Sequence, residues 1–293
     1  LTAGEANVFT GEVTAGYIPI AKTTTDVLEE FVLGLAENNS IWIGADPSST
    51  TDDAYYNNAF GEGALDAITT GDYNNAFGYN AMSNTTTGYR NEAHGYGALI
   101  TNVDGYANVA MGMETLFYYD KPIQNVAIGY NAMMGYSSAE STQPTGNTAI
   151  GTYANMRPTG NYNTAVGENA MQGETTTRSA YANTAVGRSC LYSINSGYNN
   201  VAMGLQAANN VTSGYSNTIL GAYAGEALTT GDSNVAIGEN ALKTSLLSDD
   251  TVAIGFDALY SQTVDGTSFN TAIGTKSGRS LTTGTENTIV GYR

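Results

Sequence analysis

The chain has 293 residues, of which 41% are hydrophobic, only 13% are charged and 35 are glycine, and its formal net charge is −17. A disordered chain carries more charge and fewer aromatic residues than this one, which has 21 tyrosines, so the composition favours a tightly turned β protein. The negative charge disfavours nucleic acid and anionic lipid as partners. With one cysteine and no apolar run long enough to span a membrane, the sequence predicts no internal disulfide and no membrane insertion.

Residues 1–37 carry no repeat, and we expect them to cap or connect the domain that follows. Residues 13–21 are typical of a strand. Over residues 27–36, Asp26 and Glu29 resemble a helix capping box, whereas the Val and Phe residues also allow a strand, so both alternatives stay open. A cap is needed because the open end of a strand stack invites further strand addition. The first residue is not Met and no signal-peptide pattern follows it, so we expect a processed or partial chain.

Residues 38–293 repeat the motif Asn-x-Ala-aliphatic-Gly. Its glycines recur mostly every 17 residues, with single steps of 22, 20, 19 and 16. A period this short is too small for a helical repeat and suits short strands joined by turns. The sequence therefore predicts an all-β fold, a parallel β-solenoid (β-roll or β-helix) of about fifteen 17-residue turns with equivalent strands about 4.8 Å apart.

Each position of the period keeps its own residue type. Alanine stands two places before the glycine, a larger apolar residue one place before it, and Leu or Met four places after it. We expect the glycines to occupy turns with positive φ or close chain contact. We expect the asparagine four places before the glycine to form a hydrogen-bonded structural ladder along the stack. The ladder asparagines are Asn57, Asn74, Asn91, Asn108, Asn125, Asn147, Asn163, Asn183, Asn200, Asn217, Asn234, Asn270 and Asn287, and Thr251 interrupts them.

Alternation of side chains along a strand places the alanine column and the larger apolar column on opposite faces. A thin solenoid has one interior, so one apolar column would be left in water along the whole shaft. Three-fold closure is the simplest arrangement that buries one such strip per chain, and we therefore expect a homotrimer. A single chain that covers the strip by its own curvature is the alternative.

Segments such as 125–133 (Asn-Val-Ala-Ile-Gly-Tyr-Asn-Ala-Met) and 234–242 resemble the repeats of phage tail-fibre proteins, which often end in an endosialidase-type chaperone. They are also similar to the head repeats of YadA-type trimeric adhesins, although those repeats are shorter. Residues 13–21 resemble the lead-in upstream of such repeats. The resemblance covers residues 38–293 and, more weakly, 13–37. It implies a trimeric parallel β-roll on a virion or cell surface.

Two insertions lengthen the outer return of the turns, and insertions in solenoids often lie on the binding face. Neutral drift of loop length is the alternative. The candidate binding residues in and beside these insertions are Tyr136, Glu140, Gln143, Glu174 and Arg178. A second set of exposed rings follows the repeat glycine and either stacks on sugars or forms a ladder that stabilises the roll. These rings belong to Tyr79, Tyr96, Tyr130 and Tyr292.

Side chains for catalysis and for metal binding are sparse. His94, the one histidine, takes the place of the usual apolar residue, and Cys190 falls where other turns carry alanine, so both are expected to be structural. Glu62, Glu168 and Glu239 follow the repeat glycine, but no regular carboxylate pair for glycosidase chemistry accompanies them. We expect no enzyme activity, no cofactor and no metal.

These patterns favour a structural fibre segment of a virion, a tail fibre or spike, that displays a rod for host attachment. The expected partners are further copies of the chain and a host cell-surface glycan or protein, and the expected location is the virion surface. A bacterial trimeric surface adhesin or extracellular filament subunit, at the cell surface, is the alternative. A polysaccharide depolymerase is the less favoured one.

Overall fold

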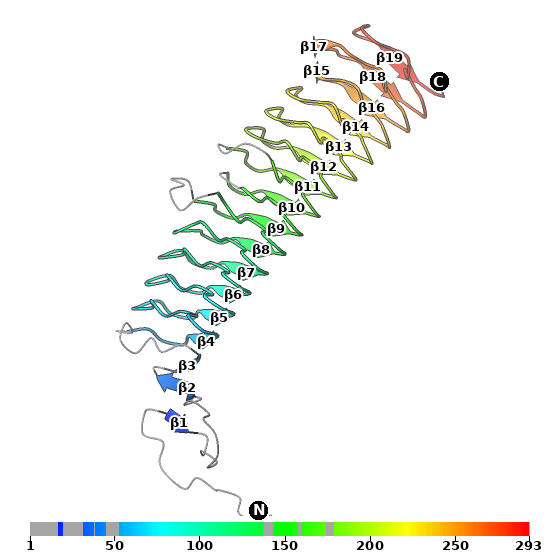
Figure 1. Cartoon of the computed structure of the whole chain (residues 1–293). Helices are drawn as coiled ribbons and strands as arrows, with labels where there is room; N and C mark the ends of the chain where they lie inside the picture. Colours follow the sequence, from blue (N-terminus) through cyan, green and yellow to red (C-terminus); the bar gives the residue numbers. More distant parts are fainter. Residues whose placement is uncertain are drawn as a thin grey trace, which may run out of the picture.

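The computed structural model describes residues 17–19, 32–37, 39–44, 53–136, 143–157, 160–173 and 179–292. Every regular element among these residues is a β-strand. The strands lie one above another along one side of an elongated, gently curved stack, and the return segments form the other side (Figure 1). This arrangement confirms the all-β, parallel β-solenoid predicted from the repeat.

The strands are short, three residues each in all but two cases. They are β1 (Tyr17–Pro19), β2 (Val32–Glu37), β3 (Ser40–Ile43), β4 (Asn58–Phe60), β5 (Asn75–Phe77), β6 (Glu92–His94), β7 (Val109–Met111), β8 (Val126–Ile128), β9 (Thr148–Ile150), β10 (Thr164–Val166), β11 (Thr184–Val186), β12 (Val201–Met203), β13 (Thr218–Leu220), β14 (Val235–Ile237), β15 (Leu247–Asp249), β16 (Val252–Ile254), β17 (Asp265–Thr267), β18 (Thr271–Ile273) and β19 (Thr288–Val290).

The motif strands β3 to β14, β16, β18 and β19 pair in parallel, each with the next, in one sheet. The register joins equivalent positions: Ala59 pairs with Ala76, and Ala127 pairs with Ala149 across the 22-residue step. From β4 to β19 the stack holds about 13 turns of about 17 residues, somewhat fewer than the fifteen predicted, which counted every motif copy as a turn. Because Ala127 still pairs with Ala149 across the longest step, an insertion leaves the strand register unchanged.

The core is a narrow column of mostly small and medium-sized apolar side chains that runs along the stack. The alanines of the strands point inward, and so do the Leu and Met residues four places after each glycine; Ala76, Leu65 and Met82 are all fully buried. These Leu and Met residues adopt left-handed backbone conformations, with φ of 53° at Leu65 and 52° at Met82. An L-residue pays a steric cost there, which the burial of a large apolar side chain offsets.

The repeat glycines form the corner at the end of each strand. Gly78 has φ of +137°, and a Cβ atom on it would lie 2.5 Å from the carbonyl oxygen of Gly95 in the next turn. Both the left-handed φ and the close contact between successive turns exclude a side chain here. The prediction for this column is thus confirmed.

The first strands pair differently from the rest. β2 runs antiparallel to β1 and to β3, with Leu35 opposite Trp42. Of the two alternatives for this segment, the strand is confirmed for residues 32–37, because backbone pairing with β3 outweighs the weak capping signal; residues 27–31 lie outside the described residues. The strand expected over 13–21 is described only at β1. Trp42, 1% exposed, stands opposite Ala59 at this end of the core.

Candidate functional site: the outer face of the sheet

The asparagine ladder lies inside the solenoid and fixes the register of its turns. The side-chain Oδ1 atom of Asn57 accepts hydrogen bonds from the backbone N–H of Asn74 at 2.8 Å and from its Nδ2 at 3.1 Å. The Nδ2 of Asn57 donates to the carbonyl oxygen of Gly71 at 2.8 Å. The same contacts recur from turn to turn, as in Asn200 and Asn217. The predicted ladder is confirmed, and it tethers the strand to the return segment of the same turn.

The one interruption of the ladder is repaired by a glutamine that the repeat does not predict. Thr251 receives a hydrogen bond at 3.2 Å from the Nε2 of Gln262, whose Oε1 accepts from the Nδ2 of Asn270 at 3.0 Å. Gln262 belongs to the 19-residue step, which also contains β17, the strand that pairs with β15 of the preceding turn. A longer side chain from the return segment thus takes over part of the role of the missing asparagine.

The outer face of the sheet carries the larger apolar residue of each motif. In β7, Met111 is 42% exposed while its neighbour Ala110 is fully buried, and the same alternation holds for Met203 and Ile273. We call this column, one residue before each repeat glycine, the apolar strip. It consists of Phe60, Phe77, His94, Met111, Ile128, Ile150, Val166, Val186, Met203, Leu220, Ile237, Ile254, Ile273 and Val290. The predicted exposure of one apolar column is confirmed.

Aromatic rings stack in short ladders at several corners. The Tyr79 and Tyr96 rings are 5.5 Å apart and nearly parallel, as the ladder interpretation requires, whereas Tyr130 meets Tyr153 edge-on. Tyr292 is 71% exposed. A longer ladder precedes β11 to β13 and joins Tyr181, Tyr198 and Tyr215, with centroid distances of 5.0 and 4.8 Å.

Carboxylates continue the column of that tyrosine ladder. The Oδ1 atom of Asp232 accepts a hydrogen bond from the backbone N–H of Tyr215 at 2.8 Å. Partial burial raises the pKa of Asp232, and the nearby Asp232 charge raises the pKa of Tyr215. Each shift favours the protonated form of its group.

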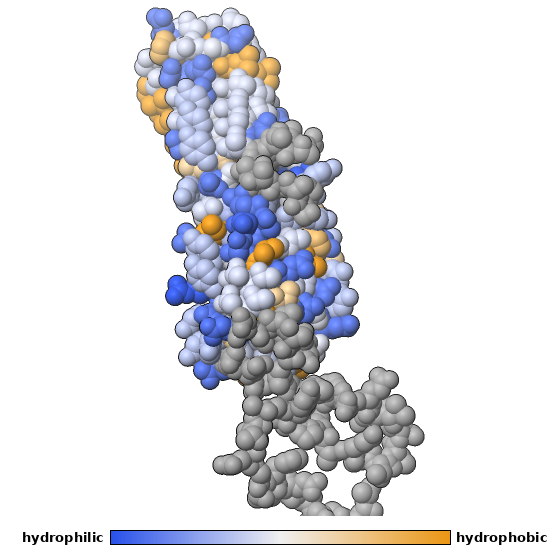
Figure 2. All heavy atoms as spheres, turned by 90° about the vertical axis from the view of Figure 1, so that its left-hand side faces the viewer, coloured by the Kyte–Doolittle hydropathy of each residue, from blue (hydrophilic) through white to orange (hydrophobic). Residues whose placement is uncertain are grey.

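The face formed by the return turns is mostly hydrophilic, with scattered hydrophobic side chains (Figure 2). Two of the candidate binding residues lie among the described residues. Tyr136 is 55% exposed and lies under the guanidinium of Arg157, at 5.1 Å from its ring centroid. The Oε1 atom of Gln143 accepts from the backbone N–H of Lys121 at 3.1 Å. Glu140, Glu174 and Arg178 lie outside the described residues, so the proposed insertion site stays a prediction.

The residues singled out for possible chemistry are dispersed. His94 lies in the apolar strip, with its ring stacked on Phe77 at 4.9 Å, and its Nε2 is 3.7 Å from the carboxylate of Glu92. Cys190 is fully buried, and burial raises the pKa of its thiol to about 12. Glu168 pairs with Arg188 at 3.3 Å.

The described part of the chain contains neither a cluster of metal-binding side chains nor a membrane-spanning helix. No group of three or more His, Cys, Asp or Glu side chains there is placed to hold a metal ion. No helix within the described ranges is long and apolar enough to cross a membrane.

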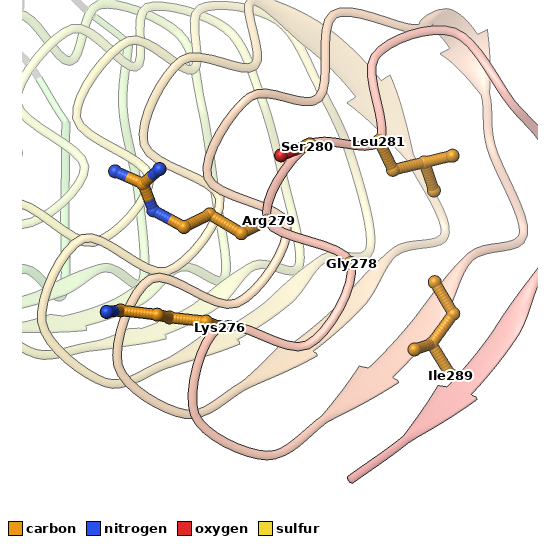
Figure 3. A pocket seen from close by; sticks show the side chains of 6 residues that line it. All are labelled: Lys276, Gly278, Arg279, Ser280, Leu281 and Ile289. Atoms are coloured by element: carbon orange, nitrogen blue, oxygen red, sulfur yellow. The ribbon is translucent and has the colours of Figure 1, made fainter. Parts of the chain in front are cut away.

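A cleft of about 500 Å³ lies at the last described turn. Leu281 and Ile289 face the space above this turn, whereas the side chains of Lys276 and Arg279 point away from them (Figure 3). Leu281 and Ile289 pack on the core, and Arg279 Nε contacts an oxygen of Asp257 at 3.0 Å. The cleft is therefore the open end of the core.

Comparisons of the chain with known protein families, with curated proteins and with solved structures find no match. The function is therefore inferred from the surfaces of the molecule itself, and first from the outer face of the sheet.

Proposed function

We propose that this chain is a structural segment of a surface fibre, of the kind carried by virion tails, in which three copies pack along the part of their apolar strips that runs from β7 to β19. The observation that carries the proposal is the apolar strip itself, which continues along the stack from β4 to β19. Its members include Ile150, Met203 and Val290, which are 38%, 49% and 72% exposed. Soluble monomers rarely expose a continuous apolar surface of this extent.

The chemistry of the outer face from β7 onward supports self-association. Val or Thr stands beside the strip in every motif strand of this part, as in Val126, Thr184 and Val235. Such β-branched side chains pack closely and bring no charge into an interface. None of the motif strands from β7 to β19 holds a charged residue, and the formal charge of −17 per chain favours solubility and opposes sideways aggregation.

Three copies are favoured because each chain has one continuous strip. Around a three-fold axis, the strips from β7 onward would meet and cover one another, and the closed symmetry would stop further growth. The result is a rod whose return faces, together with any part of the outer face not packed between copies, are available to a host glycan or protein. From β3 to β19 the fourteen strand steps would extend about 70 Å at the usual strand spacing.

Light scattering coupled to size exclusion tests the assembly. The expected mass in native buffer is about three times the 30.6 kDa of one chain. A particle of 30.6 kDa at micromolar concentration would contradict the proposal. A bacterial adhesin would share this shaft, and neighbouring genes for tail assembly distinguish the virion fibre from it.

A further inference from the structure

The outer face changes character over the first turns of the stack. In β4, β5 and β6, the position next to the apolar strip holds Asn58, Asn75 and Glu92 instead of Val or Thr. The strip there holds the rings of Phe60, Phe77 and His94, and Tyr79 and Tyr96 follow beyond the glycine corner. We call these eight residues the aromatic patch.

The polar residues of the patch form their own ladder on the outside of the sheet. The Nδ2 of Asn58 donates to the Oδ1 of Asn75 at 2.7 Å, and the Nδ2 of Asn75 donates to the Oε1 of Glu92 at 2.6 Å. All three side chains stay partly exposed. Each amide nitrogen keeps a second hydrogen, and each oxygen keeps a further lone pair. The row is thus held in place and still offers hydrogen-bonding groups to a ligand.

Aromatic rings line one side of this polar row. The Phe60 and Phe77 rings are 5.8 Å apart and nearly parallel, and they are 52% and 42% exposed. Tyr79 and Tyr96 are 47% and 50% exposed. A shallow groove of about 310 Å³ runs across the start of the patch, lined by Ile41, Asn58, Ala59, Phe60, Asn75 and Phe77.

A second copy of the chain fits the patch poorly. Packing an apolar strip onto the patch would remove water from two amides and a carboxylate without supplying new partners. The carboxylate of Glu92 would be the most costly, because a charge without a full set of hydrogen bonds is expensive to bury. The patch therefore favours a ligand that has both apolar surfaces and hydroxyl groups.

We propose that the aromatic patch binds a neutral, extended oligosaccharide. A pyranose ring offers a face of C–H groups, which packs on aromatic rings, and an edge of hydroxyls, which exchange hydrogen bonds with amides and carboxylates. The alternation of rings and polar groups once per turn repeats along the stack, as sugar units repeat along a chain. Acidic glycans are disfavoured by the net charge of −17. The inference rests on the proposed function, because it names what the fibre would contact.

The test uses the full chain and four neutral probes: the tetrasaccharides of β-1,4-linked glucose, β-1,4-linked N-acetylglucosamine, α-1,4-linked glucose and α-1,6-linked mannose. Binding is followed by calorimetry and by saturation-transfer NMR. We expect at least one probe to bind, with saturation transferred from aromatic protons. Phe77→Ala and Asn75→Ala should each raise the dissociation constant at least about tenfold. Tyr181→Ala is the matched control, since Tyr181 is 45% exposed but lies outside the patch, and it should leave binding unchanged.

Two results would overturn the inference: none of the probes binds at millimolar concentration, or binding survives both patch substitutions. A third would do so as well, namely loss of the trimeric mass in Phe77→Ala without any sugar binding, because the patch would then be a contact between copies. If the chain is monomeric and Phe77→Ala still abolishes sugar binding, the inference stands and the proposed assembly fails.

Discussion

The outer face of the sheet has two parts that differ in chemistry, while the interior beneath them is the same. Around β4 to β6, rings and hydrogen-bonded polar groups alternate. From β7 onward, Val and Thr flank aliphatic residues. Inward positions meet copies of themselves in the next turn, so every turn must satisfy the same contacts. Outward positions also contact their counterparts in the next turn, but they are not enclosed by the core, so their chemistry can change along the stack without altering the fold.

The largest effect is expected from the interior ladder, and it should be equal under both parts. Asn74→Ala and Asn217→Ala each remove an acceptor for two N–H donors and a donor to a glycine carbonyl. Leaving these buried groups unpaired should lower the free energy of unfolding by about 3–5 kcal/mol in either variant. Urea denaturation measures it. The exposed Asn84→Ala should change it by less than about 0.5 kcal/mol, and a clear inequality between the two ladder variants would show that the interior is not uniform.

A charge on the outer face should separate the two parts. Ile237→Asp places a carboxylate in the strip where we propose that copies meet, so it should weaken assembly at least about 100-fold because each buried charge lacks a partner. Phe77→Asp adds the same charge to the aromatic patch and should weaken assembly less than about tenfold. Sedimentation over a dilution series measures both. Equal effects would mean that the whole face is one interface.

The buried thiol of Cys190, which follows β11, measures how well the interior excludes water in the turns from β7 onward. Burial raises the pKa of Cys190 from 9.0 to about 12, so the folded chain keeps a proton that the unfolded chain loses above pH 9. Rising pH between 9 and 12 should therefore destabilise the protein, by about 1.4 kcal/mol per pH unit at most, with no such slope below pH 9.

Cys190→Ala is the reference for this measurement, since alanine occupies the equivalent position in most turns. The urea midpoint of the wild type should fall relative to that of Cys190→Ala as the pH rises from 8 to 11. Parallel curves would indicate that the thiol reaches water. Iodoacetamide should modify Cys190 only after unfolding.

The smallest effect is expected at the corner ladders. Tyr198→Ala removes two stacking contacts, with Tyr181 and Tyr215, and should cost about 0.5–1.5 kcal/mol for each contact. Tyr73→Ala removes its stacking contact with Tyr56 and should cost about half as much. Thermal unfolding of the two variants measures the difference, and a larger loss for Tyr73→Ala would contradict a purely additive ladder.

The period, the strands and the inner ladder could all be predicted because stacking places each residue next to the equivalent residue of the adjacent turn. A residue that recurs at one position, such as Asn125 or Gly129, reveals its own neighbours in the folded chain. A contact that is made only once along the stack produces no repeated pattern in the sequence and cannot be predicted in this way. Gln262 replaces a ladder residue from the return segment, and only the fold brings it beside Thr251. The left-handed conformation of buried Leu65 is similarly invisible, since leucine has no preference for it.

The candidate site was predictable in part. The exposed strip followed from alternation along the strand. The neighbouring column, three residues before each repeat glycine, holds Asn, Glu, Val or Thr and predicts no single role. Asn58, Asn75 and Glu92 lie one period apart, and that spacing was the signal for an outer polar row. The insertion residues Tyr136 and Gln143 lie on separate local contacts, with Arg157 and Lys121, and no pattern in the sequence indicates that they act together.

The pairing of Ala127 with Ala149 across a 22-residue step has a consequence for how such a shaft changes length. Extra residues within one turn leave the pairing of the flanking strands unchanged, whereas duplication or deletion of one complete period shifts every later strand by one strand position. Each such event would lengthen or shorten the molecule by about 4.8 Å. The number of complete periods thus sets the length of the solenoid, and each added period reuses the contacts already present between turns.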